Sequence, residues 1–161
     1  LSPAMDDLRL ARSLALATPL ALLGGAYIAQ LGFGLPPCEM CWWQRYPHFA
    51  ALVLALAAFK WPRAKILVAL AALAIGISGV IGGFHAGVEY GWWEGGTACT
   101  TTSTAGADDP LAAILDAPLV RCDVAPWSLF GISLAGWNFL ISCGAALLIF
   151  RLLARDRKAP R

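Results

Sequence analysis

The chain has 161 residues, of which 59% are hydrophobic and 14% are charged, and its formal net charge is +2. Soluble domains carry roughly 25% charged residues, so this composition argues against a soluble globular protein. The length favours a single domain over residues 1–161, and the small net charge gives no sign of a nucleic-acid-binding surface.

Four apolar stretches are each long enough to cross a bilayer as a helix. A helix rises 1.5 Å per residue, so about 20 residues cover the roughly 30 Å of hydrocarbon. Helices are expected because lipid leaves every backbone polar group to be satisfied within the segment. The expected spans are residues 13–31, 42–61, 66–84 and 127–153. The sequence therefore predicts an all-α membrane protein built as a four-transmembrane-helix bundle.

The first span could be mistaken for a signal peptide, and a proline interrupts the second span. The first exceeds the 7–15-residue core of a signal peptide, and similar runs follow it, so we expect it to be retained. The second contains Pro47, and a helix that began there would be too short to cross. A start near Trp42 places Pro47 in an early turn, with Cys41 at or just before the helix N-terminus and Arg45 in the first turn.

The basic residues predict the orientation of these spans. All Lys and Arg residues except Arg45 and Arg121 lie at the two ends of the chain or around the turn between the second and third spans. Positively charged flanks stay in the cytoplasm. Both termini are therefore expected inside, and the loops 32–41 and 85–126 outside, in the periplasm of a bacterium. Disulfides persist in that compartment.

Four of the five cysteines fall in the two outward loops, and the fifth, Cys143, is expected to pack as a small apolar residue in the last span. Cys38 and Cys41 form a C-x-x-C pair directly after Pro36 and Pro37, which stiffen the loop. This spacing is typical of a dithiol that opens and closes as a disulfide. The pair is expected at the membrane rim, within reach of a lipid-soluble electron carrier.

The long outward loop holds the other two cysteines. A Thr/Ser-rich segment follows Cys99 and is expected to be mobile. Asp109 and Pro110 then suit the start of a short amphipathic helix, which lies either on the membrane surface or on the protein itself, and Cys122 follows it. Cys99 and Cys122 suit a disulfide open to exchange, with a permanent structural bridge as the alternative.

Polar residues near the C-x-x-C pair are candidates for its chemistry. Arg45 and the helix N-terminus would both favour a Cys41 thiolate, the form that carries out exchange, while the alternative for Arg45 is contact with lipid headgroups. His85 lies at the outer end of the third span, and it or Gln44 could donate a hydrogen bond to a quinone carbonyl. A lone interfacial His is the plainer interpretation of His85.

Other polar and small residues within the spans have structural explanations. Asn138 is expected to form a hydrogen bond between helices, and His48 receives no role. Gly79 and Gly83 present a small-x-x-x-small face, which is typical of close helix packing.

These residues together resemble the DsbB family. The resemblance covers nearly the whole chain, including the four-span plan, and its most specific part is the P-C-x-x-C-x-x-Q-R string combined with two later loop cysteines. The Thr-rich stretch after Cys99 is the least family-like part. The matching segments are Pro37 to Arg45, Phe84 to Glu89, Cys99, Cys122-Asp123 and Pro126 to Asn138.

The resemblance implies a membrane enzyme that generates disulfide bonds and lies in the bacterial inner membrane. A reduced DsbA-like periplasmic thioredoxin-fold protein would attack a Cys99–Cys122 disulfide, with Cys99 forming the mixed disulfide. The Cys38–Cys41 pair would then reoxidise the loop dithiol.

The resemblance also implies a quinone as the final acceptor, either ubiquinone or menaquinone, bound without a covalent link at rest. Cys41 would pass two electrons to it, and Arg45, His85 and Gln44 would bind it. No metal is expected.

Three other classes of protein share some of these features. An enzyme of the vitamin K epoxide reductase type also pairs a membrane C-x-x-C with loop cysteines, but there the loop cysteines precede the pair. A non-catalytic protein holding zinc on the four outer cysteines usually needs two close-spaced pairs, and this chain has one. A small transporter usually carries ionisable residues in the middle of its spans.

Overall fold

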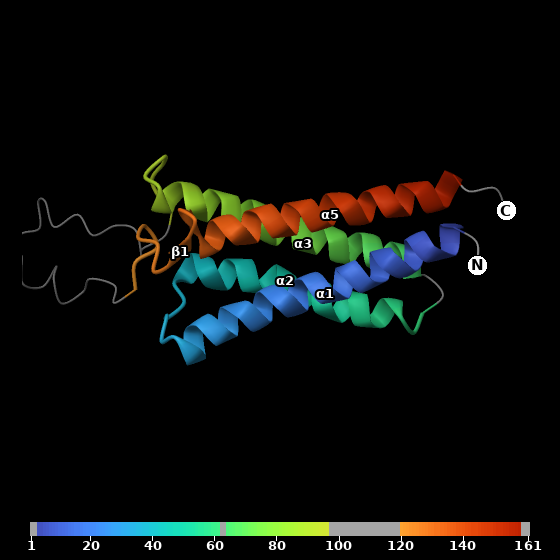
Figure 1. Ribbon diagram of the computed structural model, residues 1–161, viewed down its shortest axis with the longest axis horizontal. Coiled ribbons are helices and arrows are strands. Elements are labelled where there is room, and N and C mark those ends of the chain that lie inside the picture. The colour runs from blue at the N-terminus through green and yellow to red at the C-terminus, as the bar shows by residue number, and fades with distance from the viewer. Residues whose placement is uncertain (1–2, 62–63, 97–119, 159–161) are drawn as a thin grey trace, which may run out of the picture.

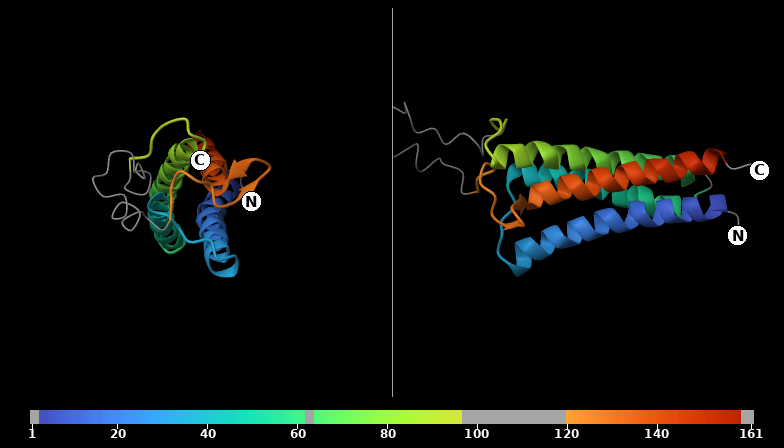
Figure 2. Two further views of the ribbon diagram at one scale, coloured as in Figure 1. Left: turned by 90° about the vertical axis from the view of Figure 1, so that its left-hand side faces the viewer. Right: turned by 45° about the horizontal axis from the view of Figure 1, so that its top comes forward.

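The computed structural model describes residues 3–61, 64–96 and 120–158. Four helices make up most of it: α1 (Pro3–Gly32), α2 (Glu39–Ala58), α3 (Ala64–Glu89) and α5 (Leu134–Lys158). They lie side by side as one bundle (Figures 1 and 2), in which α3 packs against α2 and α5, and α1 packs against α2 and α5. Cys99 and the expected amphipathic surface helix lie outside the described residues.

Three of the helices are long and apolar enough to cross a membrane within the described part of the chain. The qualifying segments are Asp6–Gly32, Lys65–Glu89 and Leu134–Arg155. Helix α2 has 20 residues but carries Gln44, Arg45 and His48 on its buried side, which lowers its hydropathy. Its place as a fourth span stays a prediction.

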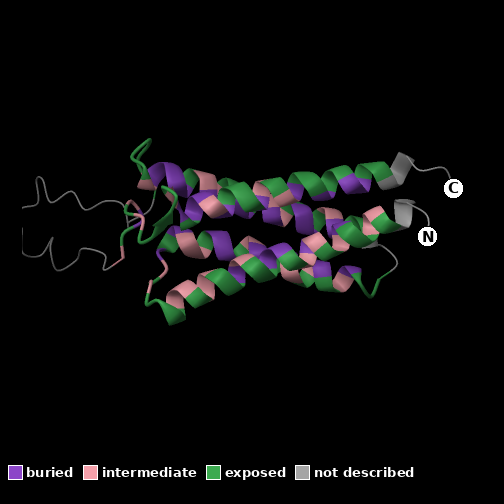
Figure 3. Cartoon of the chain, viewed as in Figure 1, coloured by how far each residue is buried: buried purple, intermediate pink, exposed green. Residues whose placement is uncertain are grey.

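The surface of the bundle suits a lipid environment. Large apolar side chains point outward along all four helices, and Figure 3 shows exposed residues along their outer faces. Val53, Leu73 and Leu147 are examples, with 67%, 52% and 64% of their surface exposed. A soluble protein rarely exposes apolar surface on this scale, so the bundle is built to sit in a membrane.

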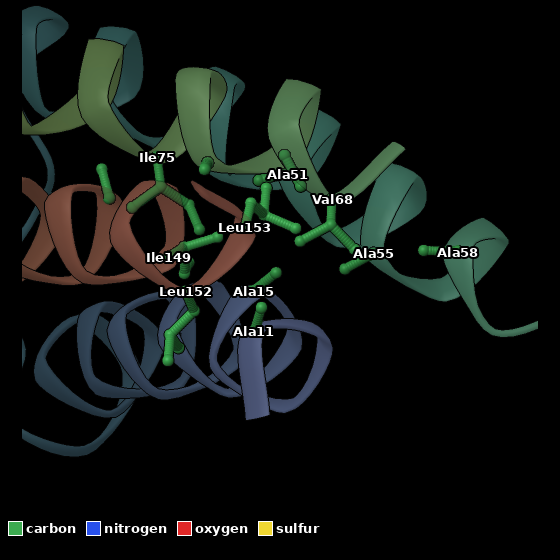
Figure 4. Close-up of a cluster of buried hydrophobic side chains, with 13 residues drawn as sticks. Ala11, Ala15, Ala51, Ala55, Ala58, Val68, Ile75, Ile149, Leu152 and Leu153 are labelled. Carbon is green, nitrogen blue, oxygen red and sulfur yellow. The ribbon is translucent and has the colours of Figure 1, made fainter. Parts of the chain in front are cut away.

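The apolar core lies toward the end of the bundle that holds both termini, and it consists largely of alanine (Figure 4). Small side chains let helix backbones approach closely in a membrane protein. The same principle explains Gly79 and Gly83, for which the prediction of close packing is confirmed. A Cβ atom at Gly79 would lie 2.7 Å from the Cys143 sulfur, and one at Gly83 would lie 2.8 Å from the Phe139 ring.

Several expected boundaries were wrong: α1 begins at Pro3 rather than at residue 13, and α3 ends at Glu89 rather than at residue 84. Helix α2 begins at Glu39 rather than near Trp42, because the Cys38 side chain caps it, and it ends at Ala58 rather than at residue 61. Cys41 therefore lies inside the first turn, and Arg45 lies in the second turn rather than in the first. The last helix does not begin at residue 127, because a hairpin of β1 (Ser128–Leu129) and β2 (Ile132–Ser133) precedes it.

The hairpin turns at Phe130 and Gly131, whose φ angles are 54° and 76°. Two successive residues with positive φ are the signature of the tight turn that suits the twist of paired strands. Tyr90, just after α3, secures the hairpin: its hydroxyl donates to the Gly131 carbonyl at 2.9 Å and accepts from the Ser133 amide at 3.0 Å.

Candidate active site

The C-x-x-C pair forms the start of α2. Cys38 is the N-cap, with φ −77° and ψ 175°, and its sulfur accepts a hydrogen bond from the Cys41 amide at 3.3 Å. An N-cap side chain satisfies one of the free amides of the first turn. The two sulfur atoms then lie 2.8 Å apart. The spacing of two residues between the cysteines is therefore what brings the sulfurs together on a helix start.

The two sulfurs differ in acidity. Both lie ahead of the apolar stretch that begins at residue 42. The hydrogen bond from the Cys38 thiol lowers the pKa of Cys41 below its ordinary value, and the Cys38 backbone amide and the Arg45 charge lower it further, against burial and the Glu89 charge. The hydrogen bond with Cys41, and then burial, raise the pKa of Cys38. Cys41 is thus the more acidic of the two sulfurs, and Cys38 contributes more to this than Arg45 does.

Cys122 lies beside this pair. It is fully buried and packs in a cluster with Cys38, Met40 and Val88. The following residue, Asp123, forms a two-contact ion pair with exposed Arg121, at 2.8 and 2.5 Å. The structure therefore brings one of the two predicted loop cysteines to the C-x-x-C pair.

His85 connects these groups from α3, level with the sulfurs as predicted. Its Nε2 lies 3.1 Å from the Cys122 carbonyl oxygen, 3.6 Å from the Cys38 sulfur and 3.7 Å from a Glu89 carboxylate oxygen. Its Nδ1 accepts from the Gln44 amide nitrogen at 2.8 Å. Because an amide nitrogen can only donate, Nδ1 is the acceptor and Nε2 carries the hydrogen.

Arg45 is buried rather than extended toward lipid headgroups. Only 6% of its surface is exposed. Its guanidinium donates to the Gln30 side-chain oxygen at 2.7 Å and to the Ala26 carbonyl at 3.5 Å, and it lies 4.8 Å from the ring centres of Tyr27 and Trp42. Aromatic faces attract a cation and so help to hold it there. Among the described residues Arg45 has no carboxylate within ion-pair distance, so its charge is left to act on the neighbouring cavity.

A buried polar network extends from His85 into the bundle. Gln44 donates to His85 and to the Met40 carbonyl, and its oxygen accepts from Asn138 at 2.9 Å. The prediction that Asn138 forms a hydrogen bond between helices is therefore confirmed, and it has several partners. Its other contacts are with Ser78 Oγ and the Ser78 carbonyl on α3, His48 Nε2 on α2 and Ser142 Oγ on its own helix.

Sequence reasoning missed Ser78, Ser142 and His48 in this network. Ser78 also donates to the Gln44 carbonyl at 2.7 Å. The available signal was the occurrence of polar side chains in apolar helices, where such residues commonly bond across to a neighbouring helix. The partners of His48, however, lie 90 and 94 residues further along the chain and follow only from the packing.

A cavity of about 200 Å³ opens between the helices beside the sulfurs. An apolar cavity of about 150 Å³ holds a benzene molecule, so this one has room for a single substituted ring. Its walls are mainly apolar, from α1 and the loop before α2. Its polar lining is Cys41, Gln44, Arg45, His48, His85, Glu89 and Asn138.

This lining fits the headgroup of a quinone. Arg45 uses two of its five N–H groups on the described residues, which leaves donors for a ligand oxygen. Apolar walls with a few placed polar groups are typical of a small-molecule site.

The ligand atoms of Cys38, Cys41 and His85 also lie within 4.8 Å of one another, close enough for the three to hold a metal ion.

Comparison with known proteins agrees with the resemblance in the sequence. The family model described as "Disulfide bond formation protein DsbB" matches residues 8–152. The chain is 30% identical over 149 residues to Disulfide bond formation protein B of Verminephrobacter eiseniae, with 88% of this chain and 83% of the relative covered. It is 31% identical over 140 residues to Disulfide bond formation protein B 2 of Pseudomonas savastanoi pv. phaseolicola, with 80% and 78% covered. No solved structure gave a significant match. The chain therefore belongs to the DsbB family, which makes it a membrane oxidoreductase that forms disulfide bonds.

Proposed function

We propose that this protein reoxidises a periplasmic DsbA-like dithiol protein and passes the electrons to a membrane quinone. The observation that carries the proposal is that the two sulfurs of the C-x-x-C pair face different surroundings. Cys38 is buried beside Cys122, whereas Cys41 lines the cavity together with Arg45 and His85. One sulfur is thus placed for exchange with the loop and the other for exchange with a ligand.

The first half of the reaction takes place on the long loop. A thiolate of the reduced partner attacks Cys99 of the Cys99–Cys122 disulfide and forms a mixed disulfide, and Cys122 leaves as a thiolate. The second thiol of the partner then attacks the mixed disulfide. The partner departs oxidised, and Cys99 and Cys122 are left reduced.

The second half transfers the two electrons to the C-x-x-C pair. The Cys122 thiolate attacks Cys38 of the Cys38–Cys41 disulfide, its neighbour in the structure, and Cys41 is released as the thiolate. Cys99 then attacks Cys122, which restores the loop disulfide and leaves Cys38 reduced. At this step Cys38 is bonded to Cys122 and has no thiol hydrogen to donate, so the charge of Arg45, which lowers the pKa of Cys41, is what favours Cys41 as the leaving group.

The cavity residues hold the acceptor in place. A bound quinone supplies a site for two electrons and two protons. Arg45 presents its remaining N–H groups and its charge to a ligand oxygen, and His85 orients the Cys122 carbonyl and the Cys38 sulfur. Gln44 fixes the ring of His85 through Nδ1. DsbA-type partners are strong oxidants, at about −120 mV, so the acceptor must have a higher potential, as ubiquinone or menaquinone would.

We further propose an inner-membrane location with both termini in the cytoplasm. The start of α1, the end of α5 and the adjoining ends of α2 and α3 lie at one end of the bundle, whereas the start of α2, which carries Cys38 and Cys41, and the hairpin lie at the other (Figure 1). The basic residues gather at the first of these ends. This arrangement supports a periplasmic location for the thiol chemistry, in a compartment where disulfides persist.

Family membership does not favour the alternatives. A zinc-binding membrane protein would use the outer cysteines as permanent ligands, and an enzyme of the vitamin K epoxide reductase type would carry its loop cysteines before the C-x-x-C pair. Zinc retained by the purified protein without any quinone would support the first of these.

The proposal is tested with the purified protein, a reduced thioredoxin-fold oxidase and ubiquinone, mixed without oxygen and followed by ubiquinone absorbance. Cys38→Ser and Cys41→Ser should each abolish ubiquinone reduction, because either change removes the disulfide that accepts electrons from the loop. Cys143→Ser is the matched control and should react at the normal rate, since Cys143 packs against Gly79 away from the cavity. Normal rates in either of the first two variants would refute the proposal.

A further inference from the structure

His48 lines the cavity and uses only part of its hydrogen-bonding capacity. Its Nε2 lies 3.0 Å from the Asn138 side-chain oxygen. Its Nδ1 is buried and has no hydrogen-bond partner among the described residues. The residue is only 3% exposed, so bulk water does not reach this nitrogen freely. A buried polar atom without a partner is costly, and the cavity is the place from which a partner can come.

The surrounding network fixes which hydrogen-bonding role Nδ1 can play. The Asn138 amide nitrogen donates to the Ser78 carbonyl at 3.1 Å and to the Gln44 oxygen at 2.9 Å. The Asn138 oxygen therefore faces His48, and as an acceptor it requires the hydrogen on Nε2. In the neutral ring Nδ1 then carries a lone pair and no hydrogen. The ligand atom that meets it must be a donor.

His48 is also placed at the right point along α2. Cys41, Arg45 and His48 are spaced i, i+4 and i+7, which puts them on one face of the helix. At 1.5 Å per residue, His48 lies about 4.5 Å further along the axis than Arg45 and about 10 Å further than Cys41. A ring on this face can place one oxygen near Arg45 and the opposite oxygen near His48.

Resting on the function proposed above, we propose that Nδ1 of His48 accepts a hydrogen bond from a hydroxyl of bound quinol, so that the cavity prefers the reduced ligand to the oxidised one. An oxidised quinone presents two carbonyl acceptors, and neither can bond a bare lone pair. One such hydrogen bond is worth about tenfold in affinity. For a two-electron couple, a tenfold preference for the quinol raises the potential of the bound couple by about 30 mV. The site would thus make its ligand a better electron acceptor.

Two substitutions separate the two ring nitrogens. His48→Gln places an amide near the position of Nε2 and can keep the bond to Asn138, but it leaves nothing at Nδ1. His48→Asn places an amide oxygen near Nδ1 and loses the reach to Asn138. His48→Gln therefore removes the contact with the ligand and keeps the contact with Asn138, and His48→Asn does the opposite.

The experiment measures binding rather than turnover. The full-length protein with Cys41→Ser, which cannot exchange electrons with the ligand, is titrated with decylubiquinone and with decylubiquinol, and tryptophan fluorescence gives both dissociation constants. The parent should bind the quinol about tenfold more tightly. His48→Gln should bring the two constants together, and His48→Asn should keep most of the preference.

Thermal unfolding supplies the control for a purely structural role. His48→Asn should lower the melting temperature more than His48→Gln, the reverse of their order in quinol preference. The inference is overturned if His48→Gln leaves the preference for the quinol unchanged, or weakens binding of the quinone more than binding of the quinol. In either case the proposed quinone-binding function is unaffected. If the parent binds neither form, both the inference and the proposed function fall.

Discussion

Asn138 holds together three of the four helices, and its replacement by leucine tests whether the polar network stabilises the bundle. Leucine has a similar size and no polar atoms. The change removes the bonds to Gln44, Ser78, His48 and Ser142. Hydrogen bonds between membrane helices average about 0.6 kcal/mol each. Three of the four partners, Gln44, Ser78 and His48, lie on other helices, so we expect the free energy of unfolding to fall by about 1.8 kcal/mol.

The measurement is an unfolding titration in mixed micelles with increasing dodecyl sulfate, followed by circular dichroism. Ser142→Ala is the matched control, because it removes one hydroxyl from the same network, with one contact across to His48 on α2, and should cost about 0.6 kcal/mol. The ratio between the two variants matters more than either value, since both share one unfolded state. An Asn138→Leu protein no less stable than Ser142→Ala would show that the partners find other bonds and that the network contributes little.

Three further outcomes follow from the site and its packing. In the reduced protein, the lowered pKa should keep Cys41 reactive toward iodoacetamide to a pH below the ordinary thiol pKa of about 8.5. Cys38→Ala should move this profile upward, and mass spectrometry over a series of pH values would measure both profiles. Gly79→Ala should destabilise the bundle by about 1–3 kcal/mol in the same titration, because α5 leaves no room for a Cβ atom at this position. Gly24→Ala is the control and should not destabilise the bundle, because a Cβ atom at Gly24 would have no other atom within 4 Å. Arg45→Ala should chiefly raise the KM for quinone in steady-state assays, and unchanged quinone kinetics would remove Arg45 from the site.

The helices were predictable from the sequence because length and hydropathy dominate in a membrane, but several of their ends were not. Cys38 caps α2 with a sulfur, and cysteine is not among the usual capping residues. The hairpin before α5 lies within one apolar run, so hydropathy alone extended the helix over it. The deciding signal was the turn at Phe130 and Gly131, which is a weak one because phenylalanine seldom adopts a positive φ.

The site was predictable to the extent that its residues are neighbours in sequence or lie at the same membrane level. Cys41, Arg45 and Gln44 share a helix face, and topology placed His85 at their depth. The role of His48 depends on which of its ring nitrogens forms the hydrogen bond to Asn138, and that follows only from the packing of α2 against α5. Likewise, nothing in the spacing of the loop places Cys122 beside Cys38 rather than elsewhere on the outer surface.

The capping role of Cys38 has a consequence for how the enzyme survives repeated cycles. The sulfur that ends the loop is held at the first turn of α2 by the Cys41 amide, and its partner sulfur already rests against it. Making and breaking the bond between them then needs little more than side-chain motion, and the backbone scaffold is spared. The first turn of α2 can therefore keep one backbone conformation in both redox states, so repeated turnover does not disturb the packing of the bundle.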